Sequence, residues 1–298
     1  MNSFTNIPCE GIDLSKYNGT VDFSAVKKAG KEFAILRAGY ARVVDPLFEA
    51  NYSGAKAAGL AVGIYWYSYA ANPDAVRLEA DCCLRILKGK QFEMPIYFDY
   101  EYEPAILALS NAQRTQNVKI FLDKLESTGY YAGLYASSDF INNLLNYKEL
   151  AKYDIWAAQY ASKCTCKLPF GMWQHHGGGV KGWPDGSCAG VKGAVDLNTS
   201  YKNYLKIIIN AGLNGFAKTE TPAENETDEA PVQEEIPAQE TFPKTYTVQA
   251  GDSFWKIAAE QLGNGNRYKE LAEFNGLSPE SVIFPGQMLK IPIRGENR

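Results

Sequence analysis

The chain has 298 residues, of which 46% are hydrophobic, enough to build one large domain and a second small one. Its formal net charge of -4 argues against nucleic acid as a partner, because phosphates repel an acidic surface. No apolar run is as long as the roughly 18 residues that a membrane-spanning helix needs, so we expect no membrane insertion. The only histidines are His175 and His176, so a triad histidine or a histidine-rich zinc site would have to use this pair.

The first half of the chain alternates strand-like and helix-like segments. Strands are expected over residues 10–15, 33–40, 61–70, 94–103 and 131–136. The helices that follow them are expected over residues 22–30, 47–59, 73–87, 111–128 and 139–151, with Asn111 as one N-cap. Regular alternation of this kind favours a parallel sheet and, with enough units, a barrel.

Beyond residue 152 the alternation stops. Strands expected over 153–160, 171–175 and 192–197 have no helical pattern between them, and a helix over 199–210 closes the domain. With eight strands and about five helices, the pattern predicts an α/β fold in the form of an irregular (β/α) barrel.

The strand expected over 94–103 runs from an apolar stretch directly into acids. Because strand side chains alternate between two faces, Asp99, Glu101 and Glu103 are expected on one face. Partial burial and like-charge repulsion should raise the pKa of one carboxyl, leaving one protonated and one ionised near neutral pH. Glycosidic bond cleavage needs such a pair. For an isolated D-x-E pattern the alternative is a sheet edge whose acids face water.

Two further acids fall at the ends of other expected strands. Asp13 ends the first strand and Asp196 ends the last. Catalytic groups of such barrels lie where strands end and loops begin, so these two should converge with Asp99 and Glu101 on one mouth of the barrel.

Aromatic and amide side chains also fall near this mouth. Tyr65 on the third strand and Trp173 with Gln174 on the seventh could stack on sugar rings or form hydrogen bonds with them. The alternative for Tyr65 and Trp173 is a place in the core. We interpret Trp66 and Tyr67 as core residues.

The six cysteines match neither a zinc pattern nor a redox C-x-x-C. A disulfide or a metal site among Cys164, Cys166 and Cys188 stays open, with free thiols as the simpler expectation. We predict no metal ion and no cofactor.

Five ordered motifs carry a family resemblance, and they are G-I-D-L-S at 11–15, G-I-Y-W-Y at 63–67, F-D-Y-E at 98–101, W-Q at 173–174 and V-D-L-N at 195–198. Residues 8–210 resemble glycoside hydrolase family 25, the Chalaropsis-type lysozymes, many of which are phage or prophage endolysins. The resemblance implies 1,4-β-N-acetylmuramidase activity, with Asp13, Asp99, Glu101 and Asp196 as the acidic site positions and Glu101 as general acid. The chain departs from the family at Trp66, where many members have His, and in a long segment over 177–193.

Residues 216–243 interrupt the apolar pattern. They are rich in Pro, Glu and Thr, and residues 218–240 hold eight acids against the single Lys218, so we predict an extended acidic linker. Residues 244–298 then form a second domain. Its expected order is a strand over 246–249, helices over 253–262 and 267–275, and a strand over 287–291.

This second domain resembles a LysM module through Y-T-V-Q-A-G-D-S, W-K-I-A, N-G-L and P-G-Q-M-L-K-I-P. The resemblance implies a βααβ fold that binds N-acetylglucosamine-containing glycans in a shallow groove between two loops. The residues expected there are Gly251, Asp252 and Ser253 on one loop, and Asn275 and Ile283 on the other. We interpret Trp255, Ile257 and Leu271 as core residues of the module.

Together these features predict a peptidoglycan hydrolase with a catalytic barrel over 1–215, the linker over 216–243 and a LysM domain over 244–298. Glu101, with its pKa raised by Asp99, would protonate the bond between N-acetylmuramic acid and N-acetylglucosamine. The first twenty residues show no signal peptide, so we expect synthesis in the cytoplasm and action on the cell wall after release. The alternatives are a non-catalytic glycan-binding protein, a chitinase-like glycosidase, and a wall amidase or cysteine peptidase.

Overall fold

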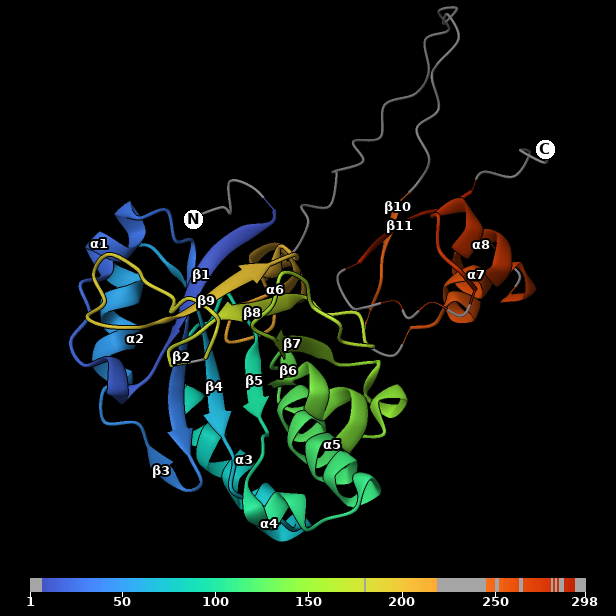
Figure 1. Ribbon diagram of the computed structural model, residues 1–298. Helices are drawn as coiled ribbons and strands as arrows, with labels where there is room; N and C mark the ends of the chain where they lie inside the picture. The colour runs from blue at the N-terminus through green and yellow to red at the C-terminus, as the bar shows by residue number, and fades with distance from the viewer. Residues whose placement is uncertain are drawn as a thin grey trace, which may run out of the picture. The chain divides into compact units, whose positions relative to one another are not determined.

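The computed structural model describes residues 7–179, 181–218, 245–249, 252–262, 265–279, 281, 283 and 287–292 (Figure 1). The chain forms two compact units that divide between Ala217 and Lys218. Most of the acidic segment expected to be a linker lies outside the described residues.

A closed barrel of eight strands forms the first unit, as the sequence predicted. Its strands are β1 (Cys9–Leu14), β2 (Phe33–Tyr40), β4 (Ala61–Tyr67), β5 (Ile96–Asp99), β6 (Ala132–Ser137), β7 (Asp154–Ala158), β8 (Met172–His176) and β9 (Asp196–Ser200). Neighbours are parallel from β1 through β2, β4, β5, β6 and β7 to β8. Strand β9 runs antiparallel to both β8 and β1 and closes the ring, while the short β3 (Val43–Val44) extends β2 as a hairpin.

Helices cover the outside of the barrel, and they are α1 (Phe23–Lys28), α2 (Phe48–Ala57), α3 (Pro73–Leu87), the short α4 (Pro104–Leu107), α5 (Asn111–Ser127) and α6 (Tyr204–Ala211). A 3₁₀ turn, η1 (Lys16–Asn18), follows β1. Helix α5 is capped by Ser110 rather than by Asn111, because the Ser110 and Gln113 side chains form a reciprocal capping box.

Two expected helices differ from the structure. The one expected over 139–151 is divided into a π-helix, η2 (Phe140–Leu144), and a 3₁₀-helix, η3 (Tyr147–Leu150). The one expected from residue 199 begins only at Tyr204, because β9 continues to Ser200.

The strands present two buried faces. Side chains on the outer face, such as Leu36, Ile64 and Phe98, pack under the helices. Side chains on the inner face, such as Tyr97 and Trp156, fill the barrel. The inner face therefore carries an apolar layer below the last inward-facing position of each strand, and those last positions form the mouth.

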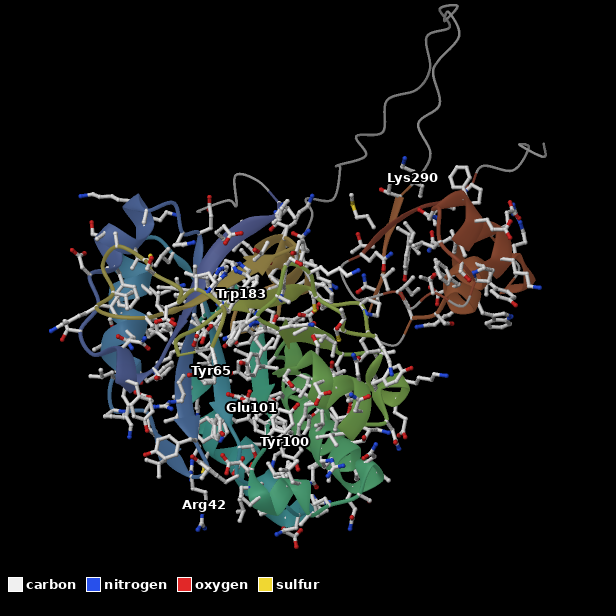
Figure 2. All side chains as sticks on the ribbon, viewed as in Figure 1. Arg42, Tyr65, Tyr100, Glu101, Trp183 and Lys290 are labelled. Atoms are coloured by element: carbon white, nitrogen blue, oxygen red, sulfur yellow. The ribbon has the colours of Figure 1, made fainter. Side chains whose placement is uncertain are left out.

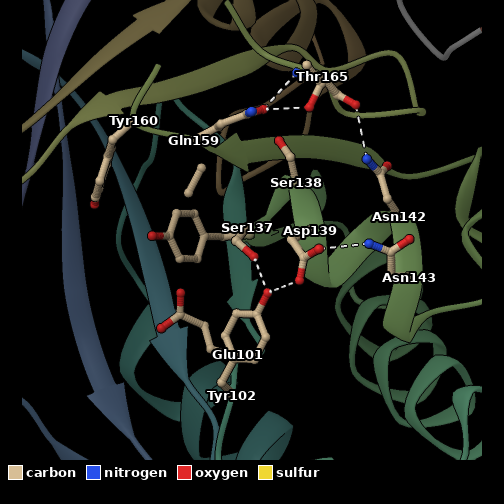
Figure 3. Close-up of a pocket in the computed structure, with 12 residues that line it drawn as sticks. Glu101, Tyr102, Ser137, Ser138, Asp139, Asn142, Asn143, Gln159, Tyr160 and Thr165 are labelled. Atoms are coloured by element: carbon tan, nitrogen blue, oxygen red, sulfur yellow. Dashed lines mark hydrogen bonds between the residues drawn. The ribbon is translucent and has the colours of Figure 1, made fainter. Parts of the chain in front are cut away.

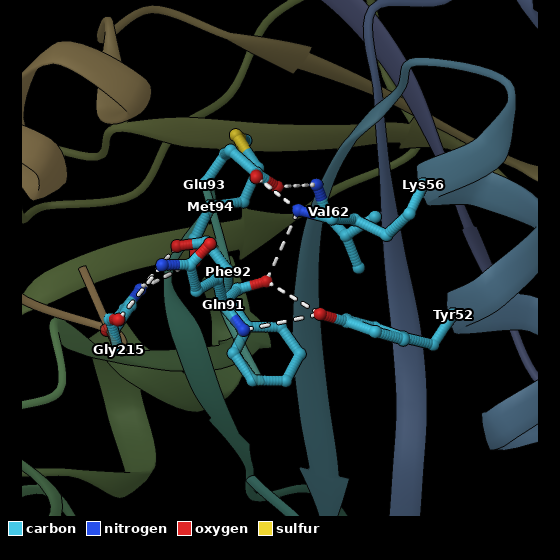
Figure 4. A network of polar contacts seen from close by, with 9 residues as sticks. Tyr52, Lys56, Val62, Gln91, Phe92, Glu93, Met94 and Gly215 are labelled. Atoms are coloured by element: carbon cyan, nitrogen blue, oxygen red, sulfur yellow. Dashed lines mark hydrogen bonds and ion pairs between the residues drawn. The ribbon is translucent and has the colours of Figure 1, made fainter. Parts of the chain in front are cut away.

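Polar contacts close the opposite end of the barrel (Figure 4). The Glu93 carboxylate pairs with Lys56 on α2 and accepts a hydrogen bond from the Val62 backbone N–H at 3.1 Å. The Asn214 amide donates to the carbonyls of Phe92 and Met94 at 3.1 and 2.9 Å. These contacts fix the amino ends of β4 and β5 and make this end a structural one.

The second unit contains β10 (Thr245–Thr247), α7 (Phe254–Leu262), η4 (Gly265–Arg267), α8 (Tyr268–Phe274) and β11 (Met288–Lys290). Strands β10 and β11 pair antiparallel, and two helices lie between them in sequence, which gives the predicted βααβ order. Ile257 and Leu271 are buried in its core as expected. The interpretation of Trp255 as core is wrong, because Phe254, Ile257 and Ala258 form the inward stripe of α7 and leave Trp255 56% exposed.

Candidate active site at the mouth of the barrel

Asp13 and Asp196 face each other across the β1–β9 pair. They are register partners and their carboxyl groups share a hydrogen bond. Asp196 begins β9 rather than ending a strand, contrary to expectation. Because β9 is antiparallel to its neighbours, its first residue lies at the same mouth as the last residues of the parallel strands. Asp196 therefore lies next to Asp13, as expected, although its strand runs in the opposite direction.

Amide donors surround the Asp13 carboxylate. Its Oδ2 atom accepts hydrogen bonds from Gln174 Nε2 and Asn198 Nδ2, both at 2.8 Å. Burial raises the pKa of Asp13 to about 6, and burial together with the Asp13 charge raises the pKa of Asp196 to about 9. At neutral pH Asp196 is therefore protonated, and its carboxyl O–H donates a hydrogen bond to the ionised Asp13 carboxylate.

Gln174 is fixed in one orientation by two tyrosines. Its Oε1 atom accepts from the hydroxyls of Tyr135 at 2.8 Å and Tyr160 at 2.9 Å, so its nitrogen must point toward Asp13. Asn198 is held similarly, because its Oδ1 atom accepts from Trp156 Nε1 at 2.8 Å. These contacts orient the acceptor atoms of Asp13.

Asp99, the last residue of β5, lies inside the mouth and is only 4% exposed. Its Oδ1 atom has no hydrogen-bond partner among the described residues. Burial, followed by the charges of Glu101 and Asp13, raises its pKa well above the usual value, and the Arg37 guanidinium opposes this rise. An acceptor oxygen without a partner at a buried mouth is available to a substrate donor.

Glu101 lies two residues beyond the end of β5, in the following loop (Figure 2). The expectation that the strand extends through Glu101 and Glu103 is wrong, since β5 ends at Asp99. Burial, and then the charges of Glu103 and Asp13, raise the pKa of Glu101 to about 7. The expected contribution of Asp99 is absent from these causes, and the repulsion between the two groups instead raises the pKa of Asp99.

Tyr65 lies on the inner face of β4, where its ring meets Trp156 edge-on with centroids 6.2 Å apart. Tyr67, two residues on, donates to Glu103 Oε1 at 2.6 Å and is only partly buried, so its interpretation as a core residue is wrong. Trp66 points the other way and is fully buried, as interpreted. Because side chains alternate along β4, Tyr65 and Tyr67 point to the mouth and Trp66 points into the core outside the barrel.

Trp173 is separated from the carboxylates. Gln174 faces Asp13, so its neighbour Trp173 lies on the outer face of β8. There its indole N–H donates to the Gln159 backbone carbonyl at 2.9 Å, and its ring packs edge-on against the His175 ring, with the ring centroids 5.3 Å apart. The structure brings Gln174 to the acids and leaves Trp173 outside the mouth.

A cavity of about 590 Å³ opens beside Glu101, at the carboxyl ends of β6 and β7 (Figure 3). Its remaining walls come from the loop after β5, from η2 and the two residues before it, and from the segment after β7. The lining residues are Glu101, Tyr102, Tyr135, Ser137, Ser138, Asp139, Asn142, Asn143, Ala158, Gln159, Tyr160 and Thr165.

Sequence reasoning did not single out Arg37, Tyr135, Tyr160 or Asn198 as site residues. A signal was present for some of them, since Asn198 is two residues from Asp196 and shares its face of β9. Arg37 likewise follows Ile35 on the inner face of β2, and its Nε atom donates to Asp45 at 2.7 Å. Tyr160 lies two residues after β7 ends, but it falls in the strand expected over 153–160 and has the parity of the inward-facing Trp156 and Ala158, so strand alternation was a signal for it too.

All six cysteines are free thiols. Among the residues that the structure describes, no group of three or more His, Cys, Asp and Glu side chains is arranged to hold a metal ion. Nor is any of the described helices both long and apolar enough to cross a membrane.

In the second unit, the polar residues expected to bind glycan hold its loops. Asp252 accepts from the Gln249 backbone N–H at 2.7 Å and from the Tyr246 hydroxyl at 2.8 Å, and Ser253 caps α7 through the Lys256 N–H. Asn275 donates to the carbonyls of Leu271 and Lys290 and accepts from the Lys290 N–H.

Ile283 packs partly buried against the core of the unit. Gly251 lies outside the described residues. The described residues of the two loops are thus held by side-chain contacts with their own unit.

The barrel and its acidic mouth agree with what comparison with known proteins finds. A model described as glycosyl hydrolases family 25 matches residues 12–182, more than half of the chain, and the chain belongs to this family. A LysM domain model matches residues 246–292.

One curated relative is an autolytic lysozyme from Clostridium acetobutylicum, 28% identical over 211 residues. The match covers 69% of this chain and 61% of that protein, so it spans less than two thirds of the relative's length.

Solved structures share the fold. The bacterial lysozyme from Streptomyces coelicolor has a TM-score of 0.58 at 24% identity, covering 72% of this chain and all of that one. The modular autolysin LytC from Streptococcus pneumoniae, solved with a synthetic peptidoglycan ligand, has a TM-score of 0.58 at 21% identity, covering 66% of this chain and 48% of that one.

Proposed function

We propose that this protein is a peptidoglycan hydrolase that cleaves the β-1,4 bond between N-acetylmuramic acid and N-acetylglucosamine. The observation that carries the proposal is the pair at the end of β5. Glu101 has a pKa raised to about 7 and lines a cavity, while Asp99 lies buried beside it with an unpartnered oxygen. Family membership and the peptidoglycan ligand bound by the autolysin LytC support the same substrate class.

In this mechanism Glu101 is the general acid. It transfers its proton to the glycosidic oxygen as the bond to the anomeric carbon breaks. Before this transfer the protonated Glu101 does not repel a negative charge on Asp99, and Arg37 favours the ionised form of Asp99. Asp99 can then stabilise the positive charge that develops on the sugar ring.

The 2-acetamido group of the substrate supplies the nucleophile in the route that we favour. Its carbonyl oxygen attacks the anomeric carbon, while its N–H donates to a carboxylate. The free Oδ1 atom of Asp99 suits this role. Water then opens the cyclic intermediate, with Glu101 accepting its proton, and the configuration is retained.

Asp13, Asp196 and Gln174 would position the reacting groups. They form a hydrogen-bonded chain that begins at the Tyr135 and Tyr160 hydroxyls and ends at the mouth. Such support holds the geometry of the site during the reaction.

The LysM domain would hold the enzyme on the wall by binding N-acetylglucosamine-containing glycans. Because the two domains belong to one chain, the second contact is effectively intramolecular, and even a weak site lowers the enzyme concentration needed. We infer action on the cell wall after release, as a phage or prophage endolysin or a bacterial autolysin.

The test is mass spectrometry of fragments released from purified peptidoglycan and reduced with borohydride. We expect reduced muramic acid at the new ends. Reduced glucosamine ends would indicate a chitinase-like cut, free peptides an amidase or peptidase, and no release a glycan-binding protein. Any of these three results would overturn the proposal.

A further inference from the structure

Glu79 on α3 carries a buried carboxyl group that the proposed mechanism does not use. It is only 4% exposed, and its Oε2 atom has no hydrogen-bond partner among the described residues. Burial raises the pKa of Glu79 to about 7, and hydrogen bonds from the Ser68 hydroxyl and the Tyr69 backbone N–H oppose this rise. An apolar side chain would be easier to bury at this position, so these contacts are what the carboxyl group provides.

The contacts of Glu79 converge on residues 68–70, the segment that follows β4. Its Oε1 atom accepts a hydrogen bond from the Tyr69 N–H at 3.3 Å. The Ser68 hydroxyl, which donates to Glu79, accepts in turn from the Ala70 N–H at 3.1 Å. Ser68 is fully buried, so its hydrogen bonds within the protein decide the conformation of this segment.

The same segment holds the end of β5 at two points. The Ser68 N–H donates to the Asp99 backbone carbonyl at 3.0 Å. The Ala70 carbonyl accepts from the Tyr100 hydroxyl at 3.2 Å, and Asn117 Nδ2 donates to that hydroxyl at 3.0 Å. Tyr100 is fully buried in the core between the barrel and the helices. Asp99 and Tyr100 are therefore fixed from behind, on the side of the strand that faces away from the mouth.

Glu101 depends on this support more than the strand residues do. Strand β5 ends at Asp99, and the nearest anchored side chain before Glu101 is that of Tyr100 (Figure 2). A general acid must lie within hydrogen-bond distance of the glycosidic oxygen, and a misplacement of about 1 Å can lower the rate about 10²-fold. A shift of residues 68–70 would be transmitted to Asp99 and Glu101 and would slow the reaction.

We propose that Glu79 is a positioning residue. By holding residues 68–70 against the end of β5, it sets the placement of Glu101 relative to Asp99. This inference rests on the proposed function of these two acids. It gives Glu79 a role in the rate of bond cleavage and none in substrate binding, because Glu79 is buried on α3, outside the barrel.

Three full-length variants test this role. Glu79→Met keeps the length of the side chain but removes its acceptor atoms, whereas Glu79→Gln keeps an acceptor oxygen for the Tyr69 N–H. Ser68→Ala removes the next contact. Asp154→Asn is the matched control, because it disturbs a buried carboxyl group at the opposite end of the barrel. Release of reducing ends from soluble peptidoglycan fragments gives kcat and KM, well below the unfolding transition of each variant.

We expect Glu79→Met to lower kcat about 10- to 100-fold with KM within about twofold of wild type, and Glu79→Gln to keep kcat within about threefold of wild type. Ser68→Ala should lower kcat about fivefold, and it should have little further effect in the Glu79→Met background, because both changes act through one segment. Asp154→Asn should lose stability and keep its kcat.

An unchanged kcat in folded Glu79→Met and Ser68→Ala would overturn the inference, and so would independent fold-changes that multiply in the double variant. A rise in KM without a fall in kcat would place Glu79 in substrate binding and would also contradict it. If Glu79→Met does not fold, the kcat of Ser68→Ala decides. The reducing ends released by the wild type are identified in the same assay, so a wrong assignment of the cleaved bond is recognised separately.

Discussion

Asp99 and Asp154 are buried to nearly the same extent inside one barrel, at 4% and 3% exposure, but at opposite ends. Asp154, at the amino end of β7, accepts hydrogen bonds from Tyr97 at 2.9 Å and Tyr204 at 2.5 Å and pairs with Lys202 at 2.5 Å. Asp99, at the carboxyl end of β5, has an oxygen without a partner among the described residues.

The difference separates a carboxylate that holds the fold from one that is left for chemistry. A buried charge is stable when hydrogen bonds and a counter-ion compensate its lost hydration, as at Asp154. Asp99 lacks that compensation, and its pKa is raised as a result. The two ends of the barrel should therefore respond differently to the same substitution, and the following variants test this.

The largest effect is expected at the mouth from Glu101→Gln. The amide keeps the shape of the side chain but has no acidic proton for the glycosidic oxygen, so kcat should fall by about 10²- to 10⁴-fold. The measurement is release of reducing ends from peptidoglycan, with circular dichroism as the control for folding. A folded variant with full activity would refute the role of Glu101.

Asp99→Asn should lower kcat by about 10²- to 10³-fold, because it removes the negative charge that stabilises the transition state. Its thermal unfolding midpoint should equal or exceed that of the wild type, since a neutral amide is easier to bury than an ionised carboxylate. Activity and melting are measured on the same preparation. A variant that loses stability instead of activity would make Asp99 a structural residue.

Asp154→Asn should produce the reverse pattern. It removes the ion pair between residue 154 and Lys202 and weakens the contacts with Tyr97 and Tyr204, at a cost of about 1–3 kcal/mol in the free energy of unfolding. Denaturant titration measures this cost. Well below the transition, kcat should stay close to wild type, and a large loss of kcat in the folded variant would remove the distinction between the two ends.

The pH dependence of stability sharpens the same contrast. The pKa of Glu101 is raised from its ordinary 4.5 to about 7, so the folded state binds its proton more tightly than the unfolded state. Stability therefore falls as pH rises from about 4.5 to about 7, and Glu101→Gln removes that part of the fall. The variant should gain more in melting temperature over wild type at pH 8 than at pH 4. Activity of the wild type should also decline as pH rises through about 7, because the general acid loses its proton.

The smallest effect on the chemistry is expected from removing residues 244–298, which lie outside the barrel unit. Lysis of whole cells should weaken, because the enzyme loses its second contact with the wall. Cleavage of small soluble glycans should stay unchanged. An equal loss on both substrates would mean that this region supports the barrel itself.

Much of the candidate site could be predicted from local patterns. Asp13 is the last inward-facing residue of β1 and Asp99 is the last residue of β5, and the carboxyl ends of parallel strands meet at one mouth. Tyr65 follows from strand alternation in the same way. Asp196 lies at the mouth as predicted, but the predicted strand position is wrong. Its strand runs antiparallel and begins where the others end. Trp173 could not be placed, because which face of β8 turns inward depends on its register with β7 and β9.

Local patterns in the chain are sufficient to predict most strands and helices, the family motifs, the acids near strand ends and the LysM signature, because each depends on residues close together in the sequence. Which groups contact one another follows instead from the folded barrel. Gln174 and Asp13 are 161 residues apart and lie at 2.8 Å, and Tyr135 and Tyr160 join them from two other parts of the barrel. The closure of the barrel sets those contacts, and burial there gives Glu101 and Asp196 their raised pKa values.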